Sequence, residues 1–420
     1  MIRKQHFVIL GAGLAGGTAA MALRQEGFDG EVTLVGTERH VPYHRPPLSK
    51  TYLRGEERFE DQLVNPEDSY ADNGIDVRLG TNALRIDPRS KQVELDSGTR
   101  LAYDRLLVTT GGRNRRPPIP GLELEGVLQL RTVDEANVIR AAASPGRKAV
   151  VVGMGFIGSE VTASLRQLGV EVTSVEGFRT PLARVVGEPV GEVLADVHRE
   201  HGVELVLEDS VAAFEGGKRV ERVRTHNGRL IECDFAVVGI GILPNSELLE
   251  AAGAAAQNGV LVDDRCRTTL PDVYAAGDLT NHQHPVFGRI RVEHWNNGFN
   301  QGRAAALSML DVGGPYDYIH SFWSDQYDQS IEYVGFALSW DQLVFRGKPE
   351  SRHFLAFYLQ EGAMRAAFGL NRGGDPEDPE QDGELKACVP LIREGVRVDS
   401  AFLADEERDL LRLASGTSAG

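Results

Sequence analysis

A glycine-containing pattern that occurs twice constrains the fold of this chain more than any other feature. Residues 7–16 read FVILGAGLAG, and residues 149–158 read AVVVGMGFIG. Each copy is an apolar run of strand length, a glycine turn and a stretch of helical length. A β-branched run follows each copy, at 31–36 and at 171–176. This is the order of a βαβ unit, so the sequence predicts an α/β protein with two Rossmann-like dinucleotide-binding domains.

The glycines of each turn have separate expected roles. The first glycine allows the tight turn after the strand, the second lets the backbone approach a pyrophosphate, and the third lets helix and strand pack closely. Backbone N–H groups at the start of the helix then bind phosphate. In chain order these glycines are Gly11, Gly13 and Gly16 in the first copy and Gly153, Gly155 and Gly158 in the second.

The residue after the second strand of each copy affects how the adenosine ribose is bound and which nucleotide is preferred. In the later copy it is Glu176, an acid that can accept hydrogen bonds from an adenosine ribose and repel a 2′-phosphate. This favours NADH over NADPH, although Arg179 and Arg184 are close enough in sequence to accommodate the extra phosphate. In the first copy the aligned residue is Gly36, and Glu38 is the candidate substitute.

Charge and cysteine content exclude several classes of protein. The chain has 45 basic and 61 acidic residues, a net charge of −16 that argues against general nucleic-acid binding. No stretch reaches the roughly 18 apolar residues of a membrane span. The uncharged run at 7–23 imitates a signal peptide. Its pattern recurs later in the chain, where no signal peptide could lie, so we expect the run to be part of the fold. Cys233, Cys266 and Cys388 lack metal-site or CxxC spacing, so we expect no metal and three reduced thiols in the cytoplasm.

Two dinucleotide sites in one chain predict that two nucleotides meet. A pyridine nucleotide and a flavin are the natural pair, because a flavin accepts hydride and can pass electrons on singly. The chain resembles the FAD-dependent, NADH-using ferredoxin reductases of the putidaredoxin reductase and dioxygenase type, which have the glutathione reductase fold. The segments that carry the resemblance are RPPLSK at 45–50, TTGG at 109–112, LRT at 130–132, GIGILPN at 239–245, AAGD at 275–278 and FWSDQYD at 322–328.

The resemblance implies a set of cofactor contacts. FAD contacts are expected at Ala15, Arg45, Lys50, Ala83, Arg131 and Asp278. Trp295 and Trp323 are expected beside the flavin, although Trp323 and Tyr327 could instead belong to a core. Ile157 and Gly241 complete the expected cofactor-binding set.

The resemblance also implies a catalytic pair. Lys50 and Glu160 are expected to form an ion pair beside the hydride-accepting nitrogen of the flavin. The alternatives are a surface lysine and an acid that favours the helix dipole. A helix starting near Asn296 would direct its positive end to the flavin pyrimidine, and Asp278 would accept hydrogen bonds from the ribityl hydroxyls.

The expected domains follow the order of these motifs. An FAD-binding domain is split between residues 1–115 and 245–320, an NADH-binding domain spans 116–244, and a C-terminal α+β domain spans 321–420.

The predicted function is electron transfer from NADH through FAD to a 2Fe–2S ferredoxin of an oxygenase system. One alternative acceptor is a small molecule, such as a quinone, dioxygen or monodehydroascorbate. A second alternative is that the protein is not primarily an electron-transfer enzyme but a redox-sensing binding protein, like apoptosis-inducing factor. A disulfide reductase is disfavoured, because residues 38–60 contain no cysteine.

Overall fold

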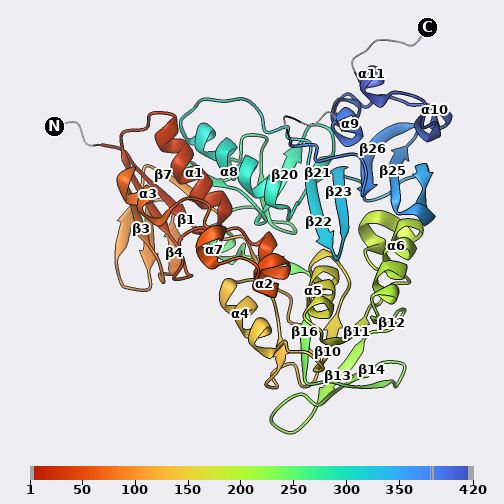
Figure 1. Cartoon of the computed structure of the whole chain (residues 1–420). Helices are drawn as coiled ribbons and strands as arrows, with labels where there is room; N and C mark the ends of the chain where they lie inside the picture. The colour runs from red at the N-terminus through yellow and green to blue at the C-terminus, as the bar shows by residue number, and fades with distance from the viewer. Residues whose placement is uncertain (1–3, 379, 381–382, 415–420) are drawn as a thin grey trace. The chain divides into compact units, whose positions relative to one another are not determined.

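The computed structural model describes residues 4–378, 380 and 383–414 of the 420-residue chain (Figure 1). It forms two compact units, each built from separate stretches of sequence. Unit 1 contains the residues up to 44 together with 59–113 and 243–320, and unit 2 contains 45–58, 114–242 and the residues from 321 onward. The segment 45–58, which includes Lys50, therefore belongs to unit 2, and so does the C-terminal region.

The centre of unit 1 is a parallel five-stranded sheet in the order β19-β7-β1-β2-β3. Alternation along β1 buries side chains on both faces. Phe7 and Ile9 enter a core with helices α1 and α8, while Val8 and Leu10 enter a second core on the other face. The bounds are β1 His6–Leu10, α1 Leu14–Gln25, β2 Glu31–Val35, β3 Ile75–Arg78, β7 Arg105–Val108, β19 Val273–Ala275 and α8 Trp295–Met309.

Smaller elements complete unit 1. Two three-stranded sheets, β4-β5-β6 and β18-β20-β21, accompany the main sheet, and α1 packs along α8 (Figure 1). The bounds are η2 Phe59–Gln62, α3 Glu67–Asp72, β4 Ala83–Asp87, β5 Gln92–Leu95, β6 Arg100–Ala102, α7 Glu247–Ala251, β18 Val260–Val262, β20 Thr280–His284 and β21 Gly288–Ile290. The chain changes from one unit to the other five times, and two of these changes fall within short strands, β8 Gly112–Asn114 and β17 Ile242–Pro244.

Unit 2 contains a second parallel sheet, in the order β12-β11-β10-β16-β9, beside an antiparallel sheet β13-β14-β15. Its strands and helices are η1 Pro46–Ser49, α2 Thr51–Arg54, β9 Val127–Leu128, α4 Val133–Ala142, β10 Lys148–Val152, α5 Phe156–Gln167, β11 Glu171–Val175, α6 Ala183–Glu200, β12 Glu204–Val206, β13 Val211–Glu215, β14 Arg222–Thr225, β15 Leu230–Glu232 and β16 Phe235–Val238.

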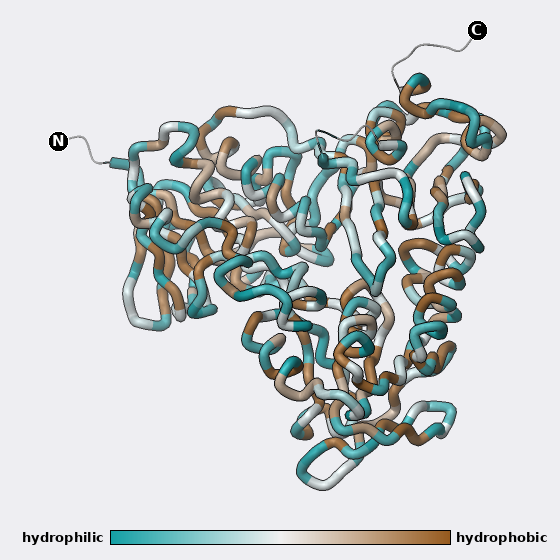
Figure 2. The backbone as a smooth tube through the Cα atoms, viewed as in Figure 1, coloured by the Kyte–Doolittle hydropathy of each residue, from teal (hydrophilic) through white to brown (hydrophobic). Residues whose placement is uncertain are grey.

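The C-terminal part of unit 2 is an antiparallel sheet in the order β22-β23-β26-β25-β24. One apolar core joins this sheet to α6, whose turns alternate between hydrophobic and hydrophilic colours in Figure 2. The bounds are β22 Ser321–Gln326, β23 Gln329–Gly335, β24 Gln342–Lys348, η3 Pro349–Ser351, β25 His353–Gln360, β26 Ala363–Leu370, α9 Glu384–Arg393, α10 Ser400–Ala404 and α11 Leu410–Ala414.

Both predicted βαβ units are confirmed. In each, the two strands pair in parallel and the helix between them starts directly after the glycine turn. The α/β class with an added α+β region is therefore confirmed. The assignment of a nucleotide to each domain, and the three-domain division itself, stay predictions.

Candidate functional site

The glycine turn of unit 1 lies at the edge where three parallel strands end. Gly11 follows β1, Thr109 follows β7, and Asp278 comes shortly after β19. Thr109 Oγ1 donates a hydrogen bond to the carbonyl of Gly11 at 2.9 Å. Gln301 Oε1 accepts the backbone N–H of Gly277 at 2.8 Å, which fixes the turn beside Asp278. Ligands of open α/β sheets bind at this kind of edge.

The spaces around the glycines match the needs of a bound dinucleotide. Gly11 has φ +115°, a conformation that favours glycine. A Cβ on Gly16 would lie 1.9 Å from the carbonyl oxygen of Gly11, so the helix can approach the strand only with glycine there. A Cβ on Gly13 would meet nothing within 4 Å, so open space lies beside the start of α1. No side chain caps α1, and its first turn contains no acid, which leaves its N–H groups available to a phosphate.

The missing acid at residue 36 has a packing explanation. A Cβ on Gly36 would lie 2.5 Å from the Cβ of Ala12 in the glycine turn, so no side chain fits there. The candidate substitute Glu38 accepts a hydrogen bond from the Tyr43 hydroxyl at 2.5 Å through Oε2. Between them, Thr37 Oγ1 donates to Asn82 Oδ1 at 2.8 Å.

The other expected FAD residues of unit 1 are spread over three elements. Ala15 is buried near the start of α1, and Ala83 packs at the margin of a core from β4. Trp295 begins α8, one residue before the expected start near Asn296. Its Nε1 donates to His44 Nδ1 at 2.9 Å, and burial lowers the pKa of His44, which keeps that nitrogen able to accept.

The predicted pair Lys50 and Glu160 is present within unit 2. Lys50 Nζ lies 3.1 Å from Glu160 Oε1, and the two side chains are only 7% and 3% exposed. This makes the surface-lysine alternative wrong. Two further donors reach the same carboxylate: Ser49 Oγ donates to Oε2 at 2.5 Å, and Ser324 Oγ donates to Oε1 at 2.7 Å.

The local sequence explains how Lys50 is presented to α5. The RPPLSK segment forms η1, and Lys50 Nζ also lies 3.3 Å from the carbonyl oxygen of Pro46. Ser164, one helical turn after Glu160, donates through Oγ to the carbonyl of Ser49 at 2.7 Å. One face of α5 therefore contacts this segment twice: Ser164 bonds its main chain, and Glu160 pairs with its lysine.

Ser49 and Ser324 are site residues that the sequence alone did not reveal. Each adjoins a predicted residue, Lys50 or Trp323, within a segment that carries the family resemblance. A hydroxyl's partner across more than a hundred residues of sequence leaves no pattern, so only the fold identifies it.

Arg45 and Arg131 are linked in unit 2. Arg45 Nη1 donates to the carbonyl of Arg131, and the N–H of Arg131 donates to Glu135 Oε2 at 2.7 Å. Glu135 also forms a capping box with Thr132 at the start of α4. The start of α4 therefore fixes the main chain of Arg131, and the carbonyl of Arg131 in turn holds the Arg45 side chain.

The second glycine turn has the same geometry as the first. Gly153 has φ +90°, a Cβ on Gly158 would lie 1.9 Å from the Gly153 carbonyl oxygen, and a Cβ on Gly155 would meet nothing within 4 Å. Gly241, with φ +91°, accepts the N–H of Arg115 through its carbonyl oxygen at 3.0 Å.

The carboxylate of Glu176 is fixed at the second turn. Its Oε2 accepts the N–H of Met154 at 2.6 Å, and its Oε1 accepts the N–H of Phe178 at 3.0 Å. The two neighbouring arginines have other partners: Arg179 lies 3.6 Å from Glu188, and the Arg184 guanidinium lies over the Phe178 ring at 5.6 Å.

Exposed apolar side chains follow the ends of the strands beside this turn. Ile157, Phe178 and Ile240 come after β10, β11 and β16, and they are 45%, 46% and 37% exposed. Large apolar side chains left in contact with water beside an open glycine turn are typical of a ligand site.

Trp323 and Tyr327 have different surroundings in unit 2. Trp323 lies on β22 opposite Glu332 of β23. Burial, with Asp375 and Asp325 adding to it, raises the pKa of Glu332 to about 8. Tyr327 stacks on His201 with ring centroids 3.6 Å apart and bonds His198 Nδ1 at 3.0 Å, so it packs against these two histidines.

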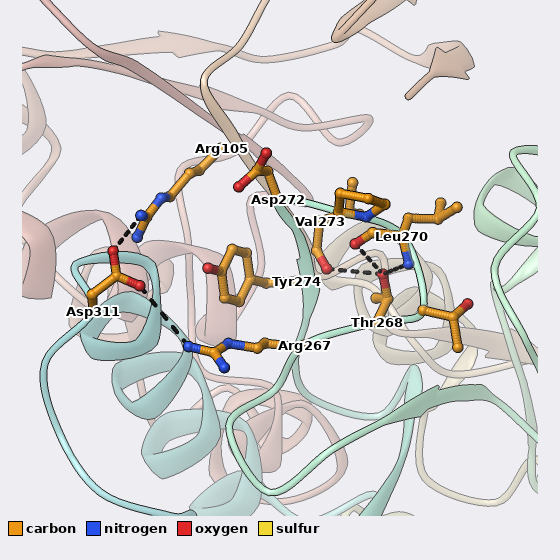
Figure 3. A pocket seen from close by; sticks show the side chains of 10 residues that line it. Arg105, Arg267, Thr268, Leu270, Asp272, Val273, Tyr274 and Asp311 are labelled. Atoms are coloured by element: carbon orange, nitrogen blue, oxygen red, sulfur yellow. Dashed lines mark hydrogen bonds and ion pairs between the residues drawn. The ribbon is translucent and has the colours of Figure 1, made fainter. Parts of the chain in front are cut away.

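A cavity of about 430 Å³ in unit 1 lies away from the expected site (Figure 3). It opens at the amino ends of β7 and β19, where Arg105 and Arg267 both interact with Asp311. None of the expected cofactor residues lines it. In the described part of the chain, no group of three or more His, Cys, Asp or Glu residues could hold a metal ion. Nor is any helix there long and apolar enough to cross a membrane.

Two family models together match most of the chain. Residues 5–302 match the pyridine nucleotide-disulphide oxidoreductase family, and residues 321–414 match the reductase C-terminal family. The 5,5'-dehydrodivanillate O-demethylase ferredoxin reductase subunit of a Sphingobium species is 38% identical, with 98% of this chain and 99% of the relative covered.

Two further similarities agree with these. The biphenyl dioxygenase system ferredoxin–NAD(+) reductase component of Paraburkholderia xenovorans is 37% identical, over 96% of this chain and 98% of the relative. A crystal structure of the covalent putidaredoxin reductase–putidaredoxin complex superposes with a TM-score of 0.93 at 32% identity, and both chains are covered completely.

Proposed function

The chain belongs to the pyridine nucleotide-disulphide oxidoreductase family, and we propose from that membership that it is an FAD-dependent NADH:ferredoxin oxidoreductase. It takes hydride from NADH and passes single electrons to a 2Fe–2S ferredoxin of an oxygenase system. The observation that carries this proposal is the full-length similarity to ferredoxin reductase components, C-terminal domain included. The expected family resemblance is confirmed.

The residues of unit 1 would hold FAD by its phosphates and its sugar. FAD, when bound, accepts two electrons as hydride and releases them one at a time. The N–H groups that follow Gly13 would bind the pyrophosphate, Glu38 would bind the adenosine ribose, and Asp278 would accept hydrogen bonds from the ribityl hydroxyls. The open space at Gly13 and the close packing at Gly16 support this assignment.

The residues of unit 2 would hold NADH and the reacting centre. The turn at Gly153, Gly155 and Gly158 would bind the coenzyme pyrophosphate. Lys50 and Glu160 would lie beside the nicotinamide, because α5 carries Glu160 on the helix that begins at this turn. Their low exposure supports a catalytic role, since a buried ion pair is electrostatically stronger than one in water.

We expect NADH to be preferred over NADPH. The Glu176 carboxylate is already fixed by two backbone N–H groups, so a 2′-phosphate would meet a negative charge that cannot turn away. Steady-state kcat/KM should favour NADH in the natural protein, and Glu176→Ala should lose most of that preference, by about tenfold or more. Glu171→Ala is the matched control, because Glu171 is exposed at the start of β11, the strand that ends just before Glu176. Equal use of NADPH by the natural protein would contradict this account.

Electrons should not pass through a thiol relay. Cys233, Cys266 and Cys388 are all buried and free. Burial raises the pKa of all three thiols, that of Cys233 to about 12, so each stays protonated and poorly nucleophilic. Three reduced thiols also support a cytoplasmic location.

A triple Cys→Ser variant should therefore keep its NADH-to-ferredoxin activity. The triple Cys→Ala variant serves as the control for packing losses, because a buried thiol behaves as a small hydrophobe. A folded, flavin-loaded variant that accepts electrons from NADH but fails to reduce ferredoxin would establish a cysteine relay.

The experiment that tests the proposed function is NADH oxidation with a panel of acceptors. We expect a 2Fe–2S ferredoxin to give a far higher kcat/KM than a rubredoxin, a quinone or dioxygen. Faster turnover with a quinone, dioxygen or monodehydroascorbate would favour a small-molecule reductase. Slow turnover with every acceptor would favour a redox-sensing binding protein.

A further inference from the structure

The carboxylate of Glu160 receives donors from three separate segments of unit 2. Lys50 Nζ and Ser324 Oγ both approach Oε1, at 3.1 Å and 2.7 Å, while Ser49 Oγ approaches Oε2 at 2.5 Å. Ser324 is completely buried, and Ser49 is 1% exposed. Water cannot replace a lost donor at such a site, so each donor contributes to fixing the orientation of the carboxylate.

The hydroxyl proton of Ser324 has a defined direction. Gln326 Nε2, on the same face of β22, lies 3.3 Å from Ser324 Oγ. An amide nitrogen can only donate, so Ser324 Oγ accepts from Gln326 and its own proton goes to Glu160. The side chain of Gln326 is itself buried. The C-terminal sheet therefore presents Ser324 to Glu160 strictly as a donor.

We propose that Ser324 is a positioning residue for hydride transfer: it fixes the Glu160 oxygen that also binds the Lys50 ammonium. The inference rests on the proposed function, in which this ion pair acts at the nicotinamide. With Ser49 as the only hydroxyl donor, the carboxylate could pivot about Oε2 and carry Oε1 away from Lys50. Ser324 prevents this movement, so the C-terminal domain supplies part of the hydride-transfer site.

Only one face of β22 is directed toward Glu160. Alternation places Ser324 on the buried face with Ser49 and Glu160, while Asp325 is exposed. A second cation, Arg54, bonds this face of α5 at Ser164 and not at Glu160: its Nη1 lies 3.3 Å from Ser164 Oγ. Lys50 is thus the cation whose position depends on the oxygen that Ser324 holds.

Ser324→Ala in the flavin-loaded protein tests the proposal by anaerobic stopped-flow mixing with NADH. The rate of flavin reduction should fall by about tenfold, while the Kd for NADH stays within about twofold. The reason is that the substitution changes the orientation of the Glu160–Lys50 pair and leaves the residues that bind the coenzyme unchanged. Ser321→Ala is the matched control: this buried serine begins the same strand and bonds Glu377 instead. Ser324→Cys, which fills the same space with a weak donor, should give an intermediate rate and carries the test if the alanine variant fails to load flavin.

A merely structural serine would not show two further effects. The Ser324→Ala loss should disappear in a Glu160→Gln background, because the hydroxyl acts through that carboxylate. In infrared spectra of the oxidised protein, the carboxylate band that Glu160→Gln removes should shift in Ser324→Ala and stay unchanged in Ser321→Ala.

The outcomes are separable from failure of the proposed function. A flavin-loaded Ser324→Ala or Ser324→Cys variant with the natural reduction rate and an unshifted band overturns the positioning role. Losses that simply add in Ser324→Ala/Glu160→Gln overturn it as well. A natural reduction rate in Glu160→Gln itself would overturn the catalytic pair, and the role of Ser324 with it.

Discussion

A Gly13→Val variant should fold and yet be isolated with little or no FAD. Beyond the adjacent residues of the chain, no heavy atom lies within 4 Å of the position that a Cβ would take, so the added side chain begins in open space. Its side chain would occupy the open space at the start of α1, where the pyrophosphate is expected. Flavin absorbance per chain, measured beside circular dichroism of the purified protein, gives the result directly.

A second glycine provides the matched control for this variant. A Cβ on Gly217 also meets nothing within 4 Å, and this residue lies in the turn between β13 and β14 of unit 2. Gly217→Val should keep full FAD occupancy. Full occupancy in Gly13→Val as well would mean that the first glycine turn does not bind the flavin nucleotide.

A Lys50→Ala variant should accept electrons from NADH about a hundred times more slowly than the natural protein. The change leaves Glu160 buried at 3% exposure without its cation, and breaking a buried ion pair typically costs about 3–5 kcal/mol. If roughly 3 kcal/mol of that appears in the transition state, the rate falls by about a hundredfold. Anaerobic stopped-flow absorbance of the flavin, over a range of NADH concentrations, measures it.

Two variants define how that loss should be interpreted. Lys148→Ala removes the exposed partner of Glu232, with side chains 52% and 82% exposed, and should leave the rate unchanged. Lys50→Arg keeps the charge and should recover part of the rate. A natural rate in Lys50→Ala would make Lys50 a bystander, despite its contact with Glu160.

The parts of the fold that were predictable from sequence are those with local patterns. Apolar runs next to Gly11 and Gly153 identify both strand–turn–helix units, because the left-handed φ and the close helix approach require glycine there. The Lys50–Glu160 contact came from the family resemblance, since no spacing rule connects residues that far apart. Its burial and its distance came from the structure.

Other features depend on tertiary packing and could not be predicted. Nothing in the sequence shows that Ala12 fills the space beside Gly36, which explains why no acid stands there. The same holds for the membership of residues 45–58 in unit 2 and for Ser324, whose partner is 164 residues away. The start of α8 was predicted within one residue, because the helix pattern itself is local.

The β22 strand connects two predictions about electron flow. Trp323 and Ser324 are neighbours in sequence, so alternation directs them to opposite faces of the strand. Ser324 bonds Glu160, and Trp323, which we expect beside the flavin, lies opposite Glu332. A single strand of the C-terminal domain therefore carries residues proposed for both the NADH side and the flavin side of the reaction.

The most direct test of the central claim is to count electrons delivered by the natural protein. The FAD-loaded protein is mixed anaerobically with limiting NADH and an excess of oxidised 2Fe–2S ferredoxin, and the ferredoxin absorbance is followed. We predict that two ferredoxin molecules are reduced for each NADH consumed, because hydride brings a pair of electrons and the acceptor takes one. Ferredoxin that stays oxidised in this mixture, while a parallel mixture with a quinone or dioxygen in its place oxidises NADH rapidly, would contradict the account.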